Sequence, residues 1–183
     1  IVTHGSVTEI VTRHGTVEGV KVRMERSGES FRARSGIVVN AAGPWLDALL
    51  KDGTSQPLIG GTKGSHIVVR RFPGAPSAAV YSEAREDRRP FFVVPWLEWL
   101  LIGTTDTPFS GNPDGVRATH DEVDYLLRQT LAIFPDSRLT HDGVLFTYAG
   151  VRPLPKVAGR LSGAVTRRHF VRHHAPHADG LYS

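Results

Sequence analysis

The sequence predicts an α/β protein whose larger part is an antiparallel sheet flanked by one amphipathic helix, so that this segment taken alone is α+β. Four strand-like runs follow one another between residues 65 and 104 with no helical run between them, which favours antiparallel pairing. A single strongly amphipathic helix is predicted after residue 119. Near the N-terminus, the apolar run 37–39 leads into a turn and a helix. This order is typical of an α/β domain, in which the strands are buried on both faces of the sheet.

The first forty residues predict a small group of strands. Apolar residues alternate through residues 6–24 on either side of His14-Gly15, which indicates a β-hairpin with a glycine turn. A third strand is expected over residues 31–39, and Ile37-Val38-Val39 is expected to be buried on both faces. The run ends in Asn40-Ala41-Ala42-Gly43-Pro44. Pro44 suits the first turn of a helix, whose buried side would be Trp45, Leu46, Leu49 and Leu50.

The middle of the chain predicts the main sheet. Residues 51–62 are rich in Gly, Thr, Ser and Pro and indicate a connection between domains. Strands are then expected at residues 65–70, 78–82, 91–95 and 99–104. The expected domains are therefore 1–57, 58–158 and a return segment, 159–183.

One helix and one long strand are expected in the second half. Thr119 followed by Glu122 has the form of a capping box, and the apolar residues that follow share one helical face until Pro135. Residues 144–152 are expected to form a strand that ends before Pro153. A further short strand is expected at residues 168–172.

Composition restricts the class of protein. The chain has 183 residues, 40% of them hydrophobic and 22% charged, which is ordinary for a globular protein. Its longest apolar stretch, residues 91–103, is interrupted and is shorter than the ~20 residues that span a bilayer. The absence of cysteine excludes disulfides and cysteine-ligated metal sites.

The basic charge leaves three interpretations open. The net charge is +4 and the isoelectric point is about 9.8, with the excess in residues 85–89 and 160–177. A solvated basic face is the simplest interpretation, contact with an anionic lipid surface or an anionic substrate is also open, and nucleic acid is not expected because no nucleic-acid-binding motif occurs. The histidines at 169, 173, 174 and 177 are surrounded by arginines, so no metal site is predicted there.

Three polar clusters lie at the ends of predicted strands. They are Lys63-Gly64-Ser65-His66, Gly103-Thr104-Thr105-Asp106 and Tyr148-Ala149-Gly150-Val151-Arg152-Pro153. A histidine, an aspartate, several hydroxyls and an arginine suit a small, oxygen-rich, anionic ligand.

Two of these residues are the best candidates for chemistry. His66 has an ordinary pKa near ~6.5, which makes it a natural acid or base, although it could equally be a packed structural residue. Arg152 lies between Val151 and Pro153, where its guanidinium needs an anionic or carbonyl partner, and a structural salt bridge is the alternative. Alternation along a regular strand would place Tyr148 on the same face as Arg152. Asp106 could orient a neighbouring cation.

Four segments resemble a known family. VVNAAGPW (38–45), KGSHIVV (63–69), LIGTTDTP (101–108) and YAGVRPL (148–154) are similar, in order and spacing, to the FAD-dependent glycerol-3-phosphate dehydrogenases of the D-amino-acid-oxidase-like flavoenzyme superfamily. The resemblance covers roughly residues 5–170. The chain lacks the family's GxGxxG turn, so we expect it to be an internal fragment, inactive and without tightly bound FAD when alone.

The resemblance implies a site. The cofactor would be FAD, bound near Ala41, Ala42, Gly43 and Trp45. His66 and Arg152 would be catalytic, and the substrate would be bound by Lys63, Thr105, Asp106 and Tyr148, with Thr105 the preferred hydroxyl.

The implied reaction is the oxidation of sn-glycerol 3-phosphate to dihydroxyacetone phosphate, with electrons passed to a quinone. The alternatives are an FAD-dependent amine or 2-hydroxy-acid oxidase, in which the arginine would hold a carboxylate, and a non-catalytic basic domain that binds anions or membranes. The family also implies a cytoplasmic protein or one peripheral at the inner face of the cytoplasmic membrane, and a homo-oligomer when full length.

Overall fold

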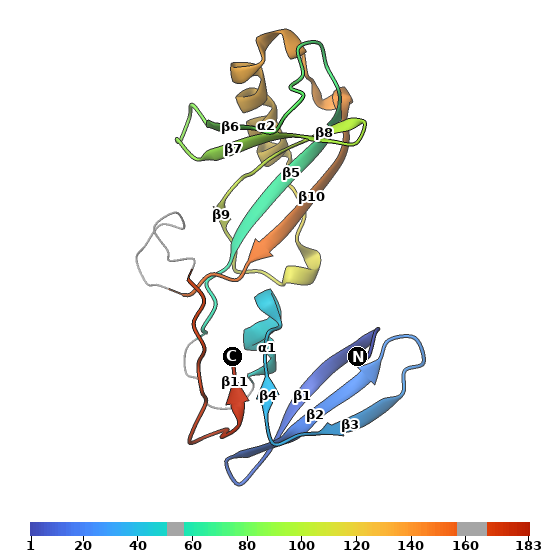
Figure 1. Ribbon diagram of the computed structural model, residues 1–183, viewed down its shortest axis with the longest axis vertical. Coiled ribbons are helices and arrows are strands. Elements are labelled where there is room, and N and C mark those ends of the chain that lie inside the picture. Colours follow the sequence, from blue (N-terminus) through green and yellow to red (C-terminus); the bar gives the residue numbers. More distant parts are fainter. Residues whose placement is uncertain (51–56, 157–167) are drawn as a thin grey trace. The chain divides into compact units, whose positions relative to one another are not determined.

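A computed structural model describes residues 1–50, 57–156 and 168–183, which fall into two compact units (Figure 1). The first unit comprises Ile1–Ile59, Leu154–Val157 and Thr166–Ser183, and the second comprises Gly60–Pro153 and Ala158–Val165. Half of the predicted interdomain connection, residues 51–56, lies outside the described residues, as does the predicted boundary at residue 158.

The first unit begins with a three-stranded antiparallel sheet. Its strands are β1 (Gly5–Arg13), β2 (Thr16–Met24) and β3 (Ser30–Arg34), in the order β1-β2-β3. His14 and Gly15 both have left-handed backbone conformations, with φ of 51° and 78°, as a two-residue hairpin turn requires. The predicted hairpin is confirmed.

The prediction for residues 31–39 is wrong in two respects. The segment is divided into β3 and a separate strand β4 (Val38–Val39), which pairs in parallel with β11 (Leu181–Tyr182). Ile37 and Val39 are 64% and 70% exposed instead of buried. A continuous apolar run needs a layer on each side, and within the described residues β4 has only the two-residue β11 as its strand partner.

The turn after β4 leads into a short helical segment. It consists of the 3₁₀ helix η1 (Gly43–Trp45) and helix α1 (Leu46–Leu49), with Pro44 in the first turn as predicted. Neither element contains a buried residue, and Trp45 is 44% exposed, so the predicted buried side is wrong for this unit taken by itself.

The second unit is built on an antiparallel sheet with the order β10-β5-β8-β7-β6. Its strands are β5 (Thr62–Arg70), β6 (Val80–Glu83), β7 (Pro90–Trp96), β8 (Trp99–Gly103) and β10 (Val144–Arg152), and the short β9 (Thr107–Pro108) also pairs with β5. The predicted antiparallel sheet is confirmed, and β10 has the predicted bounds. Strand β5 is central, between β10 and β8.

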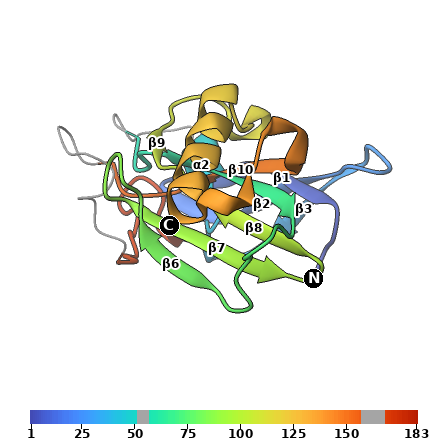
Figure 2. The ribbon, with the colours of Figure 1, turned by 90° about the horizontal axis from the view of Figure 1, so that it is seen from above.

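Helix α2 (His120–Ile133) covers one face of this sheet (Figure 2). Short 3₁₀ helices precede and follow it, namely η2 (Pro113–Gly115), η3 (Pro135–Ser137) and η4 (His141–Gly143). The predicted capping box is confirmed: Thr119 Oγ1 accepts a hydrogen bond from Glu122 N, and Glu122 Oε2 accepts one from Thr119 N.

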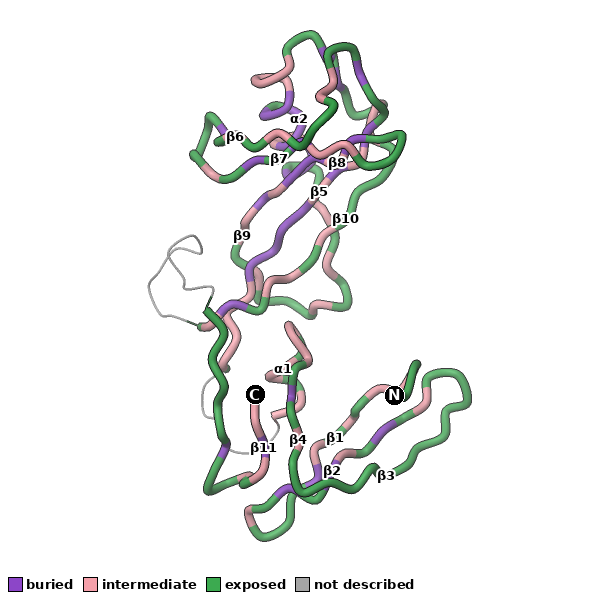
Figure 3. Tube along the Cα trace, in the orientation of Figure 1, coloured by how far each residue is buried: buried purple, intermediate pink, exposed green. Residues whose placement is uncertain are grey.

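The core lies between α2 and the face of the sheet that we call the inner face. Figure 3 shows that burial is concentrated in β5 and β8, whereas β10 is mostly exposed or half-buried. The fully buried apolar side chains are Ile67, Val69, Phe91, Val93, Leu100, Ile102 and Leu126. The opposite side, the open face, carries exposed aromatic residues such as Phe92, Trp99 and Phe146.

The capping box gives a first testable prediction. Thr119→Ala removes the hydroxyl that accepts the Glu122 amide, so we expect the free energy of unfolding to fall by about 1 kcal/mol. Thr140→Ala is the matched control, because Thr140 caps η4 with no side-chain hydrogen bond and its loss should be nearly neutral. Urea denaturation of both variants measures the difference, and equal losses would contradict the assignment.

The C-terminal segment differs from expectation. Residues 168–172 form no strand, and His173 makes only an isolated bridge with Tyr182. Within the described residues, no helix combines the length and the apolar character needed to cross a membrane.

Candidate functional site

Strand β5 supplies polar residues to both faces of its sheet, because its side chains alternate. Ile67 and Val69 lie in the core with α2, so Lys63 and Ser65 point to the inner face. Gly64 and His66 therefore belong to the open face. His66 is paired with Tyr148 in β10 on one side and with Gly103 in β8 on the other.

The His66 ring is held between its two strand neighbours. It stacks on Tyr148 with a centroid separation of 4.8 Å and an interplanar angle of 6°. On the other side a Cβ added to Gly103 would lie 2.1 Å from Cδ2 of His66, so only glycine leaves room for the ring. The buried Nδ1 of His66 has no hydrogen-bond partner among the described residues.

The surroundings of His66 favour a neutral imidazole. Burial, and then the positive charge of Arg152, lower the pKa of His66 below its ordinary value of 6.5. Burial also raises the pKa of Tyr148 above 10. Near neutral pH the stacked pair therefore offers an unprotonated imidazole and a protonated phenol.

Arg152, at the end of β10, is half-buried beside the loop after β8. Its Nη2 donates to Thr104 Oγ1 at 2.9 Å, and its Nη1 lies 3.4 Å from Asp106 Oδ1 and from the carbonyl oxygen of Thr105. A Cβ added to Gly64 would lie 2.3 Å from Nη2, so the guanidinium lies directly over the β5 backbone. The side chain of Asp106 thus orients the arginine.

The loop that carries these partners is itself fixed. Arg89, which directly precedes β7, donates a hydrogen bond to the backbone carbonyl of Asp106. Thr104, whose hydroxyl contacts Arg152, was not preferred from the sequence, which favoured Thr105. Consecutive threonines gave no means of distinguishing the two hydroxyls.

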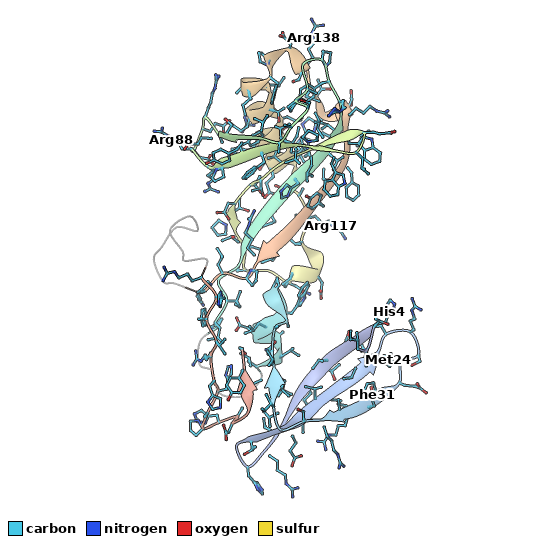
Figure 4. All side chains as sticks on the ribbon, viewed as in Figure 1. His4, Met24, Phe31, Arg88, Arg117 and Arg138 are labelled. Carbon is cyan, nitrogen blue, oxygen red and sulfur yellow. The ribbon has the colours of Figure 1, made fainter. Side chains whose placement is uncertain are left out.

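Lys63 and Thr105 belong to a different cluster, on the inner face. Lys63 Nζ lies 2.7 Å from Glu122 Oε2 of α2 and donates to the carbonyl oxygen of Arg117, which is labelled in Figure 4. Thr105 Oγ1 donates to Glu122 Oε1 at 3.0 Å and accepts from Ser65 N at 2.9 Å. These groups are nearly all buried and tie α2 to the sheet.

Glu122 is the centre of this inner cluster. Burial would raise the pKa of its carboxyl, but hydrogen bonds from Lys63, Thr119 and Thr105 outweigh burial and lower the pKa below 4.5. The carboxylate is therefore ionised at neutral pH and paired with Lys63. The sequence showed Glu122 only as a capping residue, and its contact with Lys63 depends on tertiary packing.

The structure thus brings His66, Tyr148, Asp106 and Arg152 together on the open-face side of β5 and β10. It places the side chains of Lys63 and Thr105 on the inner side with Glu122.

The residues predicted to lie near the flavin are in the first unit, in the turn that begins η1. Asn40, which is buried, holds this turn: its Nδ2 donates to Leu46 O at 3.1 Å and its Oδ1 accepts from Ala42 N at 3.3 Å. Gly43 has φ of 56°, and a Cβ placed there would meet nothing within 4 Å. Gly43 therefore leaves open space beside the backbone, where another molecule could approach closely.

Comparisons with known proteins agree with this architecture. Residues 1–182 match the family model described as FAD dependent oxidoreductase. A glycerol-3-phosphate dehydrogenase of Synechocystis sp. is 45% identical over 176 residues, which are 90% of this chain and 32% of that protein. The aerobic glycerol-3-phosphate dehydrogenase of Escherichia coli is 36% identical over 152 residues, 81% of this chain and 30% of that protein. The chain spans about a third of the length of these relatives.

Solved structures show the same fold. The glycerol-3-phosphate dehydrogenase of Bacillus halodurans, complexed with FAD, superimposes with a TM-score of 0.77 at 32% identity, over 85% of this chain and 32% of that one. A glycine oxidase of Bacillus cereus shares the fold at 21% identity, with a TM-score of 0.57, over 82% of this chain and 37% of that one. The predicted α/β class is confirmed, and the chain belongs to the FAD dependent oxidoreductase family.

Proposed function

We propose that this chain carries the substrate site of an FAD-dependent enzyme that oxidises sn-glycerol 3-phosphate to dihydroxyacetone phosphate. The observation that carries the proposal is the pairing of an imidazole of lowered pKa with an oriented guanidinium on one face of β5 and β10. One group can accept a proton, and the other can stabilise negative charge on an oxygen.

The residues of the chain fit the cofactor. The turn Ala41-Ala42-Gly43 is small and open, and Asn40 holds it in place, which suits a close backbone approach to a dinucleotide. Ala41, Ala42, Gly43 and Trp45 would hold part of FAD. When bound, FAD supplies the acceptor for the hydride that leaves the substrate carbon.

The protein's own groups would act on the C2 hydroxyl. As the C2 hydrogen leaves with its electron pair, the hydroxyl gives up its proton, and His66 would accept it. Arg152 would stabilise the negative charge that develops on this oxygen, with its guanidinium oriented by Thr104 and Asp106. Tyr148 would hold the His66 ring and donate a hydrogen bond to the substrate.

The inner cluster changes the roles first predicted for two residues. The amine of Lys63 and the hydroxyl of Thr105 are engaged by Glu122, so we now propose that they position the site rather than bind substrate. Through its backbone carbonyl, which faces Arg152, Thr105 would still help to orient the guanidinium.

The similarities favour this substrate over the alternatives. Relatives named glycerol-3-phosphate dehydrogenase match at 45% and 36% identity, whereas the glycine oxidase matches at 21%. An amine or 2-hydroxy-acid substrate and a purely anion-binding module therefore have less support.

The electron acceptor is proposed to be a quinone. The alpha-glycerophosphate oxidase of Enterococcus casseliflavus matches at 35% identity, below the 45% of the dehydrogenase of Synechocystis sp.. A position at the cytoplasmic membrane surface and a homo-oligomeric state remain predictions from the family. Assay of a purified full-length protein that carries this segment, with glycerol 3-phosphate and a quinone analogue in one arm and oxygen uptake in the other, tests both substrate and acceptor. No turnover by the FAD-loaded protein in either arm would contradict the proposed reaction.

The pH dependence of the reaction should reflect His66. Because its pKa is lowered, the imidazole stays unprotonated as the pH falls through 6.5, and kcat/KM should decline only at lower pH. In His66→Asn this acidic decline should disappear. Measuring kcat/KM from pH 5 to pH 8 would reveal it, and an unchanged decline in the variant would assign the titration to another group.

A further inference from the structure

Three potential metal ligands meet on the outer surface of the second unit, on the α2 side of the sheet. His120 begins α2, Asp124 lies one turn later, and His141 lies in η4 at the start of β10. One ligand atom from each lies within 4.8 Å of the other two. We propose that these three side chains form a binding site for a divalent transition-metal ion of the zinc type.

The side chains are already arranged around a common centre. The rings of His120 and His141 are stacked, with centroids 4.6 Å apart and an interplanar angle of 11°. The carboxylate of Asp124 approaches one edge of both rings: Oδ1 is 2.5 Å from Nε2 of His141, and Oδ2 is 3.9 Å from Nε2 of His120. The two imidazoles thus direct nitrogens toward one carboxylate.

The separations are close to those of a bound ion. Zinc–ligand bonds of about 2.0–2.2 Å place tetrahedral ligand atoms roughly 3.3 Å apart. The contact of 2.5 Å between Asp124 and His141 would have to lengthen and the longer separations, up to 4.8 Å, would have to shorten, which rotations of the exposed His120 and His141 side chains allow.

The ligand set selects the class of metal. Two imidazole nitrogens and one carboxylate suit Zn²⁺ and its neighbours, whereas Mg²⁺ and Ca²⁺ prefer oxygen ligands. Three protein ligands leave the remaining position to water. The nearby cation Arg128 is paired with Glu86, at 3.0 Å between Nε and Oε1, so that its charge is partly neutralised.

A bound ion would link helix α2 to strand β10, and both elements hold residues of the candidate site or of the inner cluster. His120 and Asp124 belong to the helix that holds Glu122, and His141 directly precedes the strand that carries Tyr148 and Arg152. The ion would bridge the first turns of α2 to the beginning of β10. It should therefore raise the thermal stability of the protein without taking part in its chemistry.

Equilibrium dialysis of the protein against Zn²⁺ tests the site. We expect one tightly bound equivalent, with affinity at least about 10-fold weaker in Asp124→Asn and in His141→Gln. His173→Gln is the matched control, because His173 contacts Asp179 at 2.8 Å but belongs to no three-ligand group among the described residues. The proposal is overturned if the unmutated protein binds no Zn²⁺, or if all four proteins bind it equally.

A second measurement uses the unmutated protein, so its result does not depend on whether the variants fold. Zn²⁺ should protect His120 and His141 from modification by diethyl pyrocarbonate, while His4, an exposed histidine of the first unit labelled in Figure 4, should react as before. A rise in melting temperature with Zn²⁺ should be reversed by a chelator. Equal modification of all three histidines with and without Zn²⁺ would exclude the site.

Discussion

Arg152→Lys in the full-length enzyme is expected to lower kcat for glycerol 3-phosphate oxidation by about 30- to 150-fold, the equivalent of one charge-assisted hydrogen bond of roughly 2–3 kcal/mol. Lysine keeps the positive charge but lacks the planar fork that contacts both Thr104 and Asp106, so its ammonium would not be held in one orientation. If Arg152 contacts the reacting oxygen, the loss should appear in kcat as well as in KM.

His66→Asn should lose less than Arg152→Lys, because solvent can accept the proton slowly once the negative oxygen is stabilised. Steady-state kinetics with an artificial electron acceptor compare the two variants. If Arg152→Lys changes only KM while His66→Asn abolishes turnover, the two roles are reversed. Glu98→Gln, at the exposed β7–β8 turn, serves as a control that should retain the full rate.

Glu122→Ala is expected to destabilise the protein by about 3–5 kcal/mol. The substitution leaves Lys63 buried without its carboxylate, removes the acceptor of the Thr105 hydroxyl and breaks the capping box. Chemical denaturation measures the loss. Glu86→Ala is the matched control, since it breaks only the exposed pair with Arg128 and should leave the free energy of unfolding nearly unchanged.

A second variant separates the buried charge from lost packing. If the unpaired lysine causes most of the cost, the double change Lys63→Met with Glu122→Leu should recover much of the stability, since it removes both buried charges together. A double variant as unstable as Glu122→Ala would show that the carboxylate acts mainly through its hydrogen bonds to the threonines.

Local patterns were sufficient to predict much of the second unit. The capping box at Thr119 and the proline at 135 delimit α2, because both act within a single turn of helix. Alternation along β10 placed Tyr148 and Arg152 on one face, because the register is regular from Phe146 onward. These features depend on neighbouring residues alone.

Other features depend on contacts that no local pattern contains. Ile37 and Val39 are exposed because, within the described residues, β4 pairs only with the short strand β11. The meeting of His120 with His141 depends on how η4 returns to α2, across 21 positions of the sequence.

Alternation in β5 was visible in the sequence and would have separated two of the predicted site residues. Lys63 and His66 are three positions apart, an odd number, so a regular strand must point them to opposite faces. The family motif KGSHIVV contains both residues but does not indicate that their side chains point to opposite faces of the sheet. The tertiary partners, Glu122 for Lys63 and Tyr148 for His66, make it plain.

Strand β5 directs polar side chains to both faces of its sheet, and this arrangement limits how the segment can change in length. Inserting or deleting one residue between Lys63 and His66 would make their spacing even and direct both side chains to the same face, so that either the lysine would leave Glu122 or the imidazole would turn toward the core. A change of two residues would preserve the faces but shift the histidine away from Tyr148 and Gly103. Natural variants of the gene should therefore show a fixed spacing across these four codons.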